Sequence, residues 1–310
     1  MMHMLMLGFV RNCRGVHPRA LNLSVRIAAL CVLGTVASQA ARAQPADATF
    51  QYPLAVAATS DSVLYVADRL LPGVWKISDA APAIFAQGTK QFRTPLNAIR
   101  AVATAADGTV FVGDSATREV YRLADDGTPT PLTGGSIGIP VDIAITSSGD
   151  LFVSDLETQR IWKLPAVGGS PEEVVQLAAP RGLCVDGNDQ LWAIAASGEA
   201  PLVRVSADGS VQPVVTERAF EFPHDVVVDA AGTAYVSDNY AKTIWKVSPA
   251  GEVSPFVSGA PLQGPVGLAL SADGVLVADP RAKAIFLLDA AGTLTEVAAA
   301  GAASAPAREE

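Results

Sequence analysis

Short runs of β-branched and apolar residues alternate with turn segments along most of the chain. In residues 139–169 and just beyond, the apolar runs read DIAIT, LFVSD, RIWKL and EEVVQL, separated by SSG, LETQ and PAVGGSP. Runs of this length, bounded by turn residues, are typical of β-strands. The segments between them lack the 3.6-residue period of an amphipathic helix. The pattern therefore predicts four strands in each stretch of about 40 residues.

This pattern recurs six times. Residues 222–252, FPHDVVVDAAGTAYVSDNYAKTIWKVSPAGE, match 139–169 closely, and successive copies open at intervals of 40 to 46 residues. The opening residues are Pro53, Ile99, Pro140, Pro180, Pro223 and Pro265. Repeats of this length with four strands each are typical of β-propeller blades. We therefore predict an all-β fold, a six-bladed β-propeller of four-stranded antiparallel blades, over residues 44–297.

The sequence is compatible with two ways of closing the ring. Residues 47–53, DATFQYP, resemble the end of a repeat and could add a closing strand to the last blade, yet the sixth copy has a fourth strand of its own. Residues 298–310 are rich in Ala and Pro, and we predict that they form a disordered tail.

The first 43 residues differ in kind from the repeats. They contain arginines but no acidic residue, then an apolar run from Ile27 to Val36, and they end in Ala41-Arg42-Ala43. A basic start, a short apolar run and an A-x-A site are typical of a secretory signal peptide. The apolar run is too short for a membrane anchor. We predict export to the periplasm or beyond the cell, with no integral membrane anchor.

The net charge of the chain without its predicted signal peptide limits the classes of partner that it is expected to bind. The chain carries 22 basic and 31 acidic residues, a net charge of −9, and five of the basic residues lie in the predicted signal. The remainder would hold 17 basic against 31 acidic residues, a net charge of −14. An acidic chain of this kind is a poor match for nucleic acid. The predicted partners are a protein segment or a small polar molecule.

Six copies in one chain separate architecture from function, because a residue type that every blade needs is most simply structural. An aspartate ends the second predicted strand in five copies, and we expect its carboxylate to accept backbone N–H groups of the following turn. Cys184 occupies a position that holds Ala or Val in the other copies, so we expect a buried structural thiol. The five aspartates are Asp68, Asp114, Asp155, Asp238 and Asp279.

The two positions after the opening residue do vary, from apolar to both signs of charge. In a propeller they lie at one mouth of the central channel, where convergent polar groups suggest a ligand site. The residues predicted to bind ligand there are Arg100, Asp142, Arg181, His224 and Asp225, with Asn239 and Tyr240 in an outer ring. The alternative is structural, with Arg100 paired to Asp142 and Arg181 paired to Asp225.

A family resemblance follows from the repeat. The phrase P-x-x-[VIL]-[AV]-[VIL]-x-x-x-G-x-[LAV]-[YFW]-V-[AS]-D, followed by I-W-K-[VL], resembles NHL-type propeller repeats. The resemblance implies the propeller fold, and such propellers serve both as binding platforms and as scaffolds of hydrolases or lyases. We expect mainly a binding platform.

The phrase PRGLCVDGNDQLW, residues 180–192, is also similar to gluconolactonase-type propellers, which hold calcium on the axis. Several ligand positions of that family differ here, with Gln51 in place of a glutamate. We therefore predict no cofactor, and the sequence assigns no catalytic residue. The alternative is a metal-assisted hydrolase or lyase of lactones or esters, with calcium held by Gln51, Asp142 and Asp225. His224 and Asp225 should point to opposite faces of a regular strand, which disfavours a Ser-His-Asp triad.

Overall fold

The computed structural model describes residues 49–71, 73–78, 82–196 and 199–299. These residues belong to a unit that spans Gln44–Glu310, whereas the predicted signal peptide lies outside the described residues. Within the described part of the chain, no helix is both long enough and apolar enough to cross a membrane.

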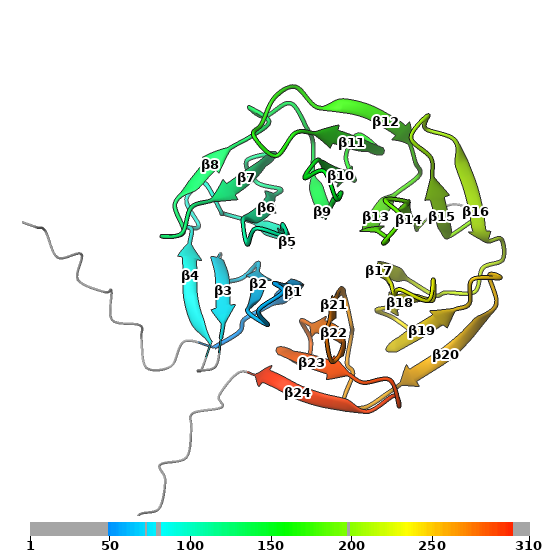
Figure 1. The fold of residues 1–310 in the computed structure, drawn as a ribbon. Coiled ribbons are helices and arrows are strands. Elements are labelled where there is room, and N and C mark those ends of the chain that lie inside the picture. Colours follow the sequence, from blue (N-terminus) through cyan, green and yellow to red (C-terminus); the bar gives the residue numbers. More distant parts are fainter. Residues whose placement is uncertain (1–48, 72, 79–81, 197–198, 300–310) are drawn as a thin grey trace, which may run out of the picture. The chain divides into compact units, whose positions relative to one another are not determined.

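Six four-stranded antiparallel sheets make up this unit, as the repeats predict (Figure 1). Each sheet consists of four consecutive strands, so we number the sheets as blades 1 to 6. Blade 1 contains β1 (Pro53–Ala58), β2 (Leu64–Asp68), β3 (Gly73–Ile77) and β4 (Ala83–Gln87). Blade 2 contains β5 (Ile99–Thr104), β6 (Val110–Asp114), β7 (Glu119–Leu123) and β8 (Pro129–Pro131). Blade 3 contains β9 (Pro140–Ile145), β10 (Leu151–Asp155), β11 (Arg160–Leu164) and β12 (Glu172–Gln176).

The other three blades repeat this order. Blade 4 contains β13 (Pro180–Val185), β14 (Leu191–Ala195), β15 (Leu202–Val205) and β16 (Val211–Val215). Blade 5 contains β17 (Pro223–Val228), β18 (Ala234–Asp238), β19 (Thr243–Val247) and β20 (Val253–Ser258). Blade 6 contains β21 (Gly267–Ser271), β22 (Gly274–Asp279), β23 (Ala284–Leu288) and β24 (Leu294–Ala299). The first strand of each blade lies nearest the central channel and the fourth lies outermost (Figure 1).

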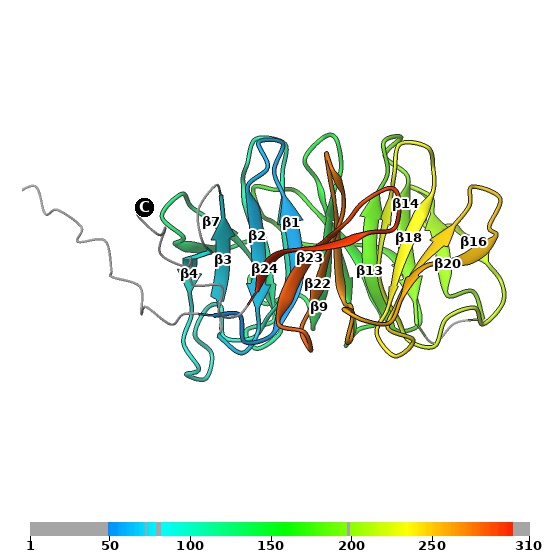
Figure 2. The same ribbon diagram turned by 90° about the horizontal axis from the view of Figure 1, so that it is seen from below.

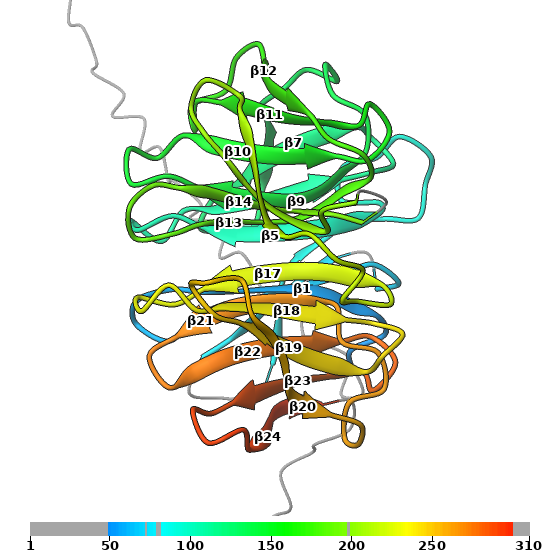
Figure 3. The ribbon, with the colours of Figure 1, turned by 90° about the vertical axis from the view of Figure 1, so that its right-hand side faces the viewer.

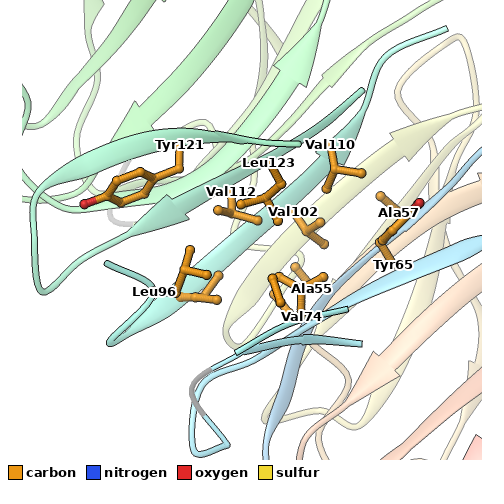
Figure 4. Packing of buried hydrophobic residues seen from close by; sticks show 13 residues of the cluster. Ala55, Ala57, Tyr65, Val74, Leu96, Val102, Val110, Val112, Tyr121 and Leu123 are labelled. Atoms are coloured by element: carbon orange, nitrogen blue, oxygen red, sulfur yellow. The ribbon is translucent and has the colours of Figure 1, made fainter. Parts of the chain in front are cut away.

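Apolar side chains pack between neighbouring blades. Between blades 1 and 2, small residues of the inner strands, such as Ala55 and Ala57, meet Val102, Val112 and Tyr121 (Figure 4). Each such interface removes the faces of two sheets from water, which is the main stabilising contribution in a chain without a disulfide among its described residues. The third strand carries an aromatic residue in five of the six blades, and Trp75 of β3 lies in such an interface with no exposed surface.

The ring closes by packing between blades 6 and 1, in which β21 lies against β1. The proposed closing strand is not formed, since residues 49–52 have no strand structure and β24 completes blade 6. Phe50 instead lies between the two blades, edge-on to Trp75 at 5.3 Å between ring centroids. The strand β24 extends to Ala299, two residues past the predicted boundary, and residues 300–310 of the predicted tail lie outside the described residues.

Strand direction determines which loops meet at each face. Pro53 at the start of β1 pairs with Asp68 at the end of β2, and the opening residues of blades 2 to 5 pair in the same way with the last residue of the second strand. The loops that lead into first strands and those that leave second strands therefore share one face, which we call the mouth face. The hairpins between first and second strands lie at the opposite face (Figures 2 and 3).

The repeated aspartates hold the mouth face together. Asp155 has no exposed surface and accepts hydrogen bonds from the N–H groups of Glu157 and Thr158 in the following turn, which confirms the sequence-based expectation. It also accepts from Gly138 at 2.7 Å and Ile139 at 2.9 Å, in the loop that leads into β9. Each such carboxylate thus ties two loops of its blade together, and the second loop is not evident from the sequence.

Candidate functional site

A cavity lies at the mouth end of the central channel, and the first strands of all six blades contribute to it. Side chains nearly fill it, because only about 20 Å³ admits a water-sized molecule. A single ordered water needs roughly 10–15 Å³ by this measure. A larger ligand must therefore bind over the side chains at the opening. The lining residues are Leu54, Ala55, Arg100, Val141, Asp142, Arg181, Gly182, His224, Asp225 and Gly267.

All five residues predicted to converge at the inner ring therefore do so. We use the name channel mouth for Arg100, Asp142, Arg181, His224 and Asp225. They come from four consecutive blades, on β5, β9, β13 and β17.

A β-bulge at the start of the first strand in each of the first five blades sets the direction of these side chains. Strand pairing shifts register directly after the opening residue, so that the next residue has no partner on the second strand. Bulges interrupt the alternation of side chains and often lie beside binding sites. His224 and Asp225 consequently line the same cavity, which corrects the expectation that they face opposite sides. The residues that follow the opening position in these blades are Leu54, Arg100, Val141, Arg181 and His224.

Asp142 and Asp225 bind backbone rather than arginine. Asp142 accepts the N–H of Ile143 at 2.8 Å through Oδ1 and that of Leu183, in the next blade, at 2.7 Å through Oδ2. Asp225 accepts from Val226 and from Leu268 in blade 6, each at 2.7 Å. Each carboxyl group thus links its own first strand to that of the following blade.

The two carboxyl groups also lie close enough together that each influences the pKa of the other. Burial raises the pKa of Asp142 to about 7. Burial, followed by the charge of Asp142, raises the pKa of Asp225 well above its ordinary value. Two carboxylates this close cannot both ionise readily, so the pair holds a proton near neutral pH.

The sequence-based ion pairs are therefore wrong. The ion pairs in the described part of the chain are Arg118–Glu157, Arg160–Glu173 and Lys163–Asp150. Arg100 and Arg181 do not pair with Asp142 and Asp225, because the carboxyl oxygens already accept backbone N–H groups.

Aromatic rings hold Arg181 in place. Its guanidinium carbon lies 4.5 Å from the ring centroid of Phe222, and Phe222 stacks on Tyr240 with 4.7 Å between centroids and an interplanar angle of 18°. Tyr240 is 59% exposed, which places it at the outer edge of the mouth. Sequence reasoning missed Phe222. The aromatic residue directly before Pro223 was the available signal, since Tyr52 precedes Pro53 in the same way.

His224 is neutral near pH 7. Burial, then the positive charges of Arg181 and Arg100, lowers its pKa to about 3. Arg181 Nη1 lies 3.5 Å from His224 Nε2, at the long limit of a hydrogen bond. The positive charge of the channel mouth therefore comes from its arginines.

Two predicted residues lie apart from this group. Asn239 does not line the cavity, and its side chain donates to Gly264 O at 3.0 Å, in the loop that leads into blade 6. Gln51, a candidate calcium ligand, does not line it either, and its amide donates to Thr49.

The calcium ligand set is consequently not assembled. Gln51 lies elsewhere, and the oxygens of Asp142 and Asp225 accept backbone N–H groups. In the part of the chain that the structure describes, no three His, Cys, Asp or Glu side chains are grouped to hold a metal. A hard cation usually takes six or more oxygen ligands, which this arrangement does not offer.

The carboxyl pair predicts an unusual dependence of stability on pH. An aspartate in the unfolded chain titrates near pH 3.9, so between about pH 4 and 7 the folded chain holds more protons on this pair. Its stabilising contribution is full below about pH 4 and is lost as the pH rises through 7. The variant Asp142→Asn cannot ionise, and we expect it to gain on the order of 2 kcal/mol relative to wild type between pH 4 and 8. Urea unfolding at each pH measures this.

The titration of His224 changes the stability of the folded state with pH in the opposite direction. Its lowered pKa makes the folded state lose stability as the pH falls below about 6.5. Arg100 and Arg181 stay charged throughout, and the pKa of Cys184 lies near 12. His224, Arg100, Arg181 and Cys184 are present in both wild type and Asp142→Asn. The difference between the unfolding free energies of the two proteins therefore isolates the contribution of the carboxyl pair. A difference in unfolding free energy that does not vary with pH would contradict the raised pKa of the carboxyl pair.

Cys184 provides a further prediction. Burial raises the pKa of its thiol to about 12, which agrees with a structural role. We expect iodoacetamide at pH 8 to modify Cys184 at least about a hundredfold more slowly in the folded chain than in urea, because the thiolate is the reactive form. Mass spectrometry of the peptide containing Cys184 measures the rate. Similar rates in the two states would refute the buried thiol.

Comparison with known proteins supports the fold. No family model matches the chain. A curated relative, virginiamycin B lyase from Nocardia farcinica (strain IFM 10152), is 29% identical over 190 residues, 61% of this chain and 65% of that protein. The chain therefore spans less than two thirds of this relative's length.

Solved structures share the propeller at low identity. A virginiamycin B lyase from Staphylococcus aureus has a TM-score of 0.62 at 15% identity, over 80% of this chain and 84% of that one. A gluconolactonase from Xanthomonas campestris has a TM-score of 0.63 at 13% identity, over 75% and 84%. A chain of a nidogen–laminin complex has a TM-score of 0.63 at 18% identity, over 78% and 91%. At such identities the likeness shows the fold alone.

Proposed function

We propose that this chain is an exported, NHL-like β-propeller that binds a protein segment or a small polar molecule at the channel mouth. The observation that carries the proposal is the convergence of Arg100, Arg181 and His224 over the carboxyl pair of Asp142 and Asp225. The two arginines lack ion-pair partners in the described residues, so their positive charges are available to a ligand. The fold is also shared with a protein found in a nidogen–laminin complex.

Export rests on the N-terminal sequence. A basic start, a short apolar run and Ala41-Arg42-Ala43 support cleavage near Gln44. The test is expression in a bacterium followed by fractionation and N-terminal mass analysis. A cleaved chain in the periplasm or medium supports export, and an uncleaved chain in the cytoplasm refutes it.

Binding is tested by thermal unfolding with a panel of small polar molecules that includes acids, amines, sugars and peptides. A ligand that binds only the folded chain raises its midpoint of unfolding. We expect at least one molecule to do so with wild type and not with Arg181→Gln. The matched control is Arg122→Gln, which removes the same charge from an exposed position on β7. A panel without a shift, or shifts that Arg181→Gln leaves unchanged, would refute binding at the mouth.

A second candidate is a hydrolase or lyase of lactone or ester substrates. The match to a virginiamycin B lyase favours it, as does Asp142, since a carboxyl group with a pKa near 7 suits general acid–base work at neutral pH. The residues do not fit a calcium site, so this candidate relies on Asp142 with Arg181 as a cationic neighbour. We expect turnover of a lactone, an ester or a cyclic depsipeptide that Asp142→Asn abolishes and Arg122→Gln retains. No turnover across the panel, with and without added calcium or magnesium, would reject it.

A further inference from the structure

The channel mouth concentrates positive charge in an acidic protein. Arg69 and Arg181 are close enough to Arg100 that their positive charges, after burial, lower its pKa. The chain as a whole has a net charge of −9. Like charges that are gathered without counter-charges destabilise the folded state, so this cluster has no evident structural benefit.

The carboxyl groups of Asp142 and Asp225 do not fully neutralise the two arginines. Asp142 and Asp225 direct their oxygens to backbone N–H groups, and the pair holds a proton near neutral pH. The pair then contributes about one negative charge, against the two guanidinium groups of Arg100 and Arg181. His224 is neutral and adds no charge of either sign.

Both arginines also keep an unsatisfied donor. The Nε atoms of Arg100 and Arg181 are buried and have no hydrogen-bond partner in the described structure. An unpaired buried donor is unfavourable, and a charged donor more so. The guanidinium of Arg181 lies over Phe222, which itself stacks on Tyr240, so aromatic rings restrain its position at the opening.

We propose that the channel mouth binds an oxyanion, a carboxylate or phosphate group of the ligand, between Arg100 and Arg181. This inference rests on the proposed binding function and names the chemistry of its ligand. A guanidinium donates two parallel N–H groups that match carboxylate or phosphate oxygens. Two such groups, from blades 2 and 4 of one opening, supply the donors, and the anion supplies the missing counter-charge.

The test titrates the full chain with inorganic phosphate and, separately, with citrate, at an ionic strength held constant with sodium chloride. Calorimetry gives the affinity. We expect saturable binding to at least one probe, weakened at least tenfold by Arg100→Gln combined with Arg181→Gln and unchanged in Arg122→Gln. The probe that binds more tightly, phosphate or citrate, identifies phosphate or carboxylate as the preferred group.

The ring of His224 provides an independent readout by NMR. Its pKa lies near 3 partly because Arg181 and Arg100 repel the imidazolium, so a bound anion should raise it. The His224 signal is assigned by its loss in His224→Gln. If the double Gln variant does not fold, Arg100→Lys with Arg181→Lys retains the charges and should still weaken binding, because lysine lacks the paired donors.

The outcomes separate this inference from the proposed function. If neutral molecules of the panel bind at the mouth but neither phosphate nor citrate does, the oxyanion is refuted and the binding function stands. If the anions bind equally well to wild type and the double variant, the site is not at these arginines, and the inference fails. If neither anions nor neutral molecules bind, both fail.

Discussion

Replacing Gly182 with alanine is expected to lower the free energy of unfolding by about 3 kcal/mol, the upper end for overpacking. An added Cβ would lie 2.4 Å from both Cα and Oδ1 of Asp225, in the neighbouring blade. Backbone cannot withdraw as a flexible side chain can, so blades 4 and 5 must separate or Asp225 must move. The backbone of Gly182 does not have a positive φ, so the effect is steric rather than conformational.

Urea unfolding of the full chain measures the loss, and Gly187→Ala is the matched control. Gly187 lies in the same blade, and an added Cβ there meets no atom within 4 Å. We expect Gly187→Ala to change stability by less than about 1 kcal/mol. Equal effects of the two substitutions would show that blades 4 and 5 are not in close contact at the channel mouth.

The second large effect is expected for Asp155→Ala, with a loss of about 4 kcal/mol. The substitution removes the acceptor for backbone N–H groups in two loops. It also removes the acceptor for Thr158 Oγ1 at 2.6 Å and for Trp162 Nε1 at 3.0 Å. The site has no exposed surface, so water does not readily replace the carboxylate.

Asp189→Asn is the control for this substitution. Asp189 is exposed and bonds Ser147 from a turn, so we expect a change of less than about 0.5 kcal/mol. If Asp155→Ala were as mild, the repeated aspartates would not hold the two loops of each blade. Since the backbone N–H contacts to two loops recur at Asp68, Asp114, Asp238 and Asp279, the corresponding variants there should also be strongly destabilised.

Repetition made the fold predictable. Four apolar runs per copy, six copies and a constant interval leave few alternatives to a propeller, because period and strand number are local properties of the sequence. The same repetition identified the aspartates as structural and Cys184 as a structural thiol, which the fold leaves partly buried against an apolar cluster. It also placed Arg100, Asp142, Arg181, His224 and Asp225 at one end of the channel, because equivalent positions in a ring must meet there.

Contacts between blades were not predictable in the same way. The ion pairs expected from opposite charges do not form, since Asp142 and Asp225 reach the N–H groups of Leu183 and Leu268 in the following blades. The bulge after Pro223 places His224 and Asp225 on one cavity, against the alternation of a regular strand. Closure of the ring depends on Phe50 between the first and last blades rather than on an exchanged strand.

The sequence by itself determined the all-β class, the six blades and the ring of variable residues at the channel mouth. These follow from patterns within 40 to 46 residues, where hydrophobic periodicity and turn chemistry act locally. Only the tertiary structure decided which charged groups are neutralised. That outcome depends on distances between blades and on burial, which raised the pKa of Asp142 and Asp225, made backbone N–H groups their partners and left Arg100 and Arg181 without an ion-pair partner among the described residues.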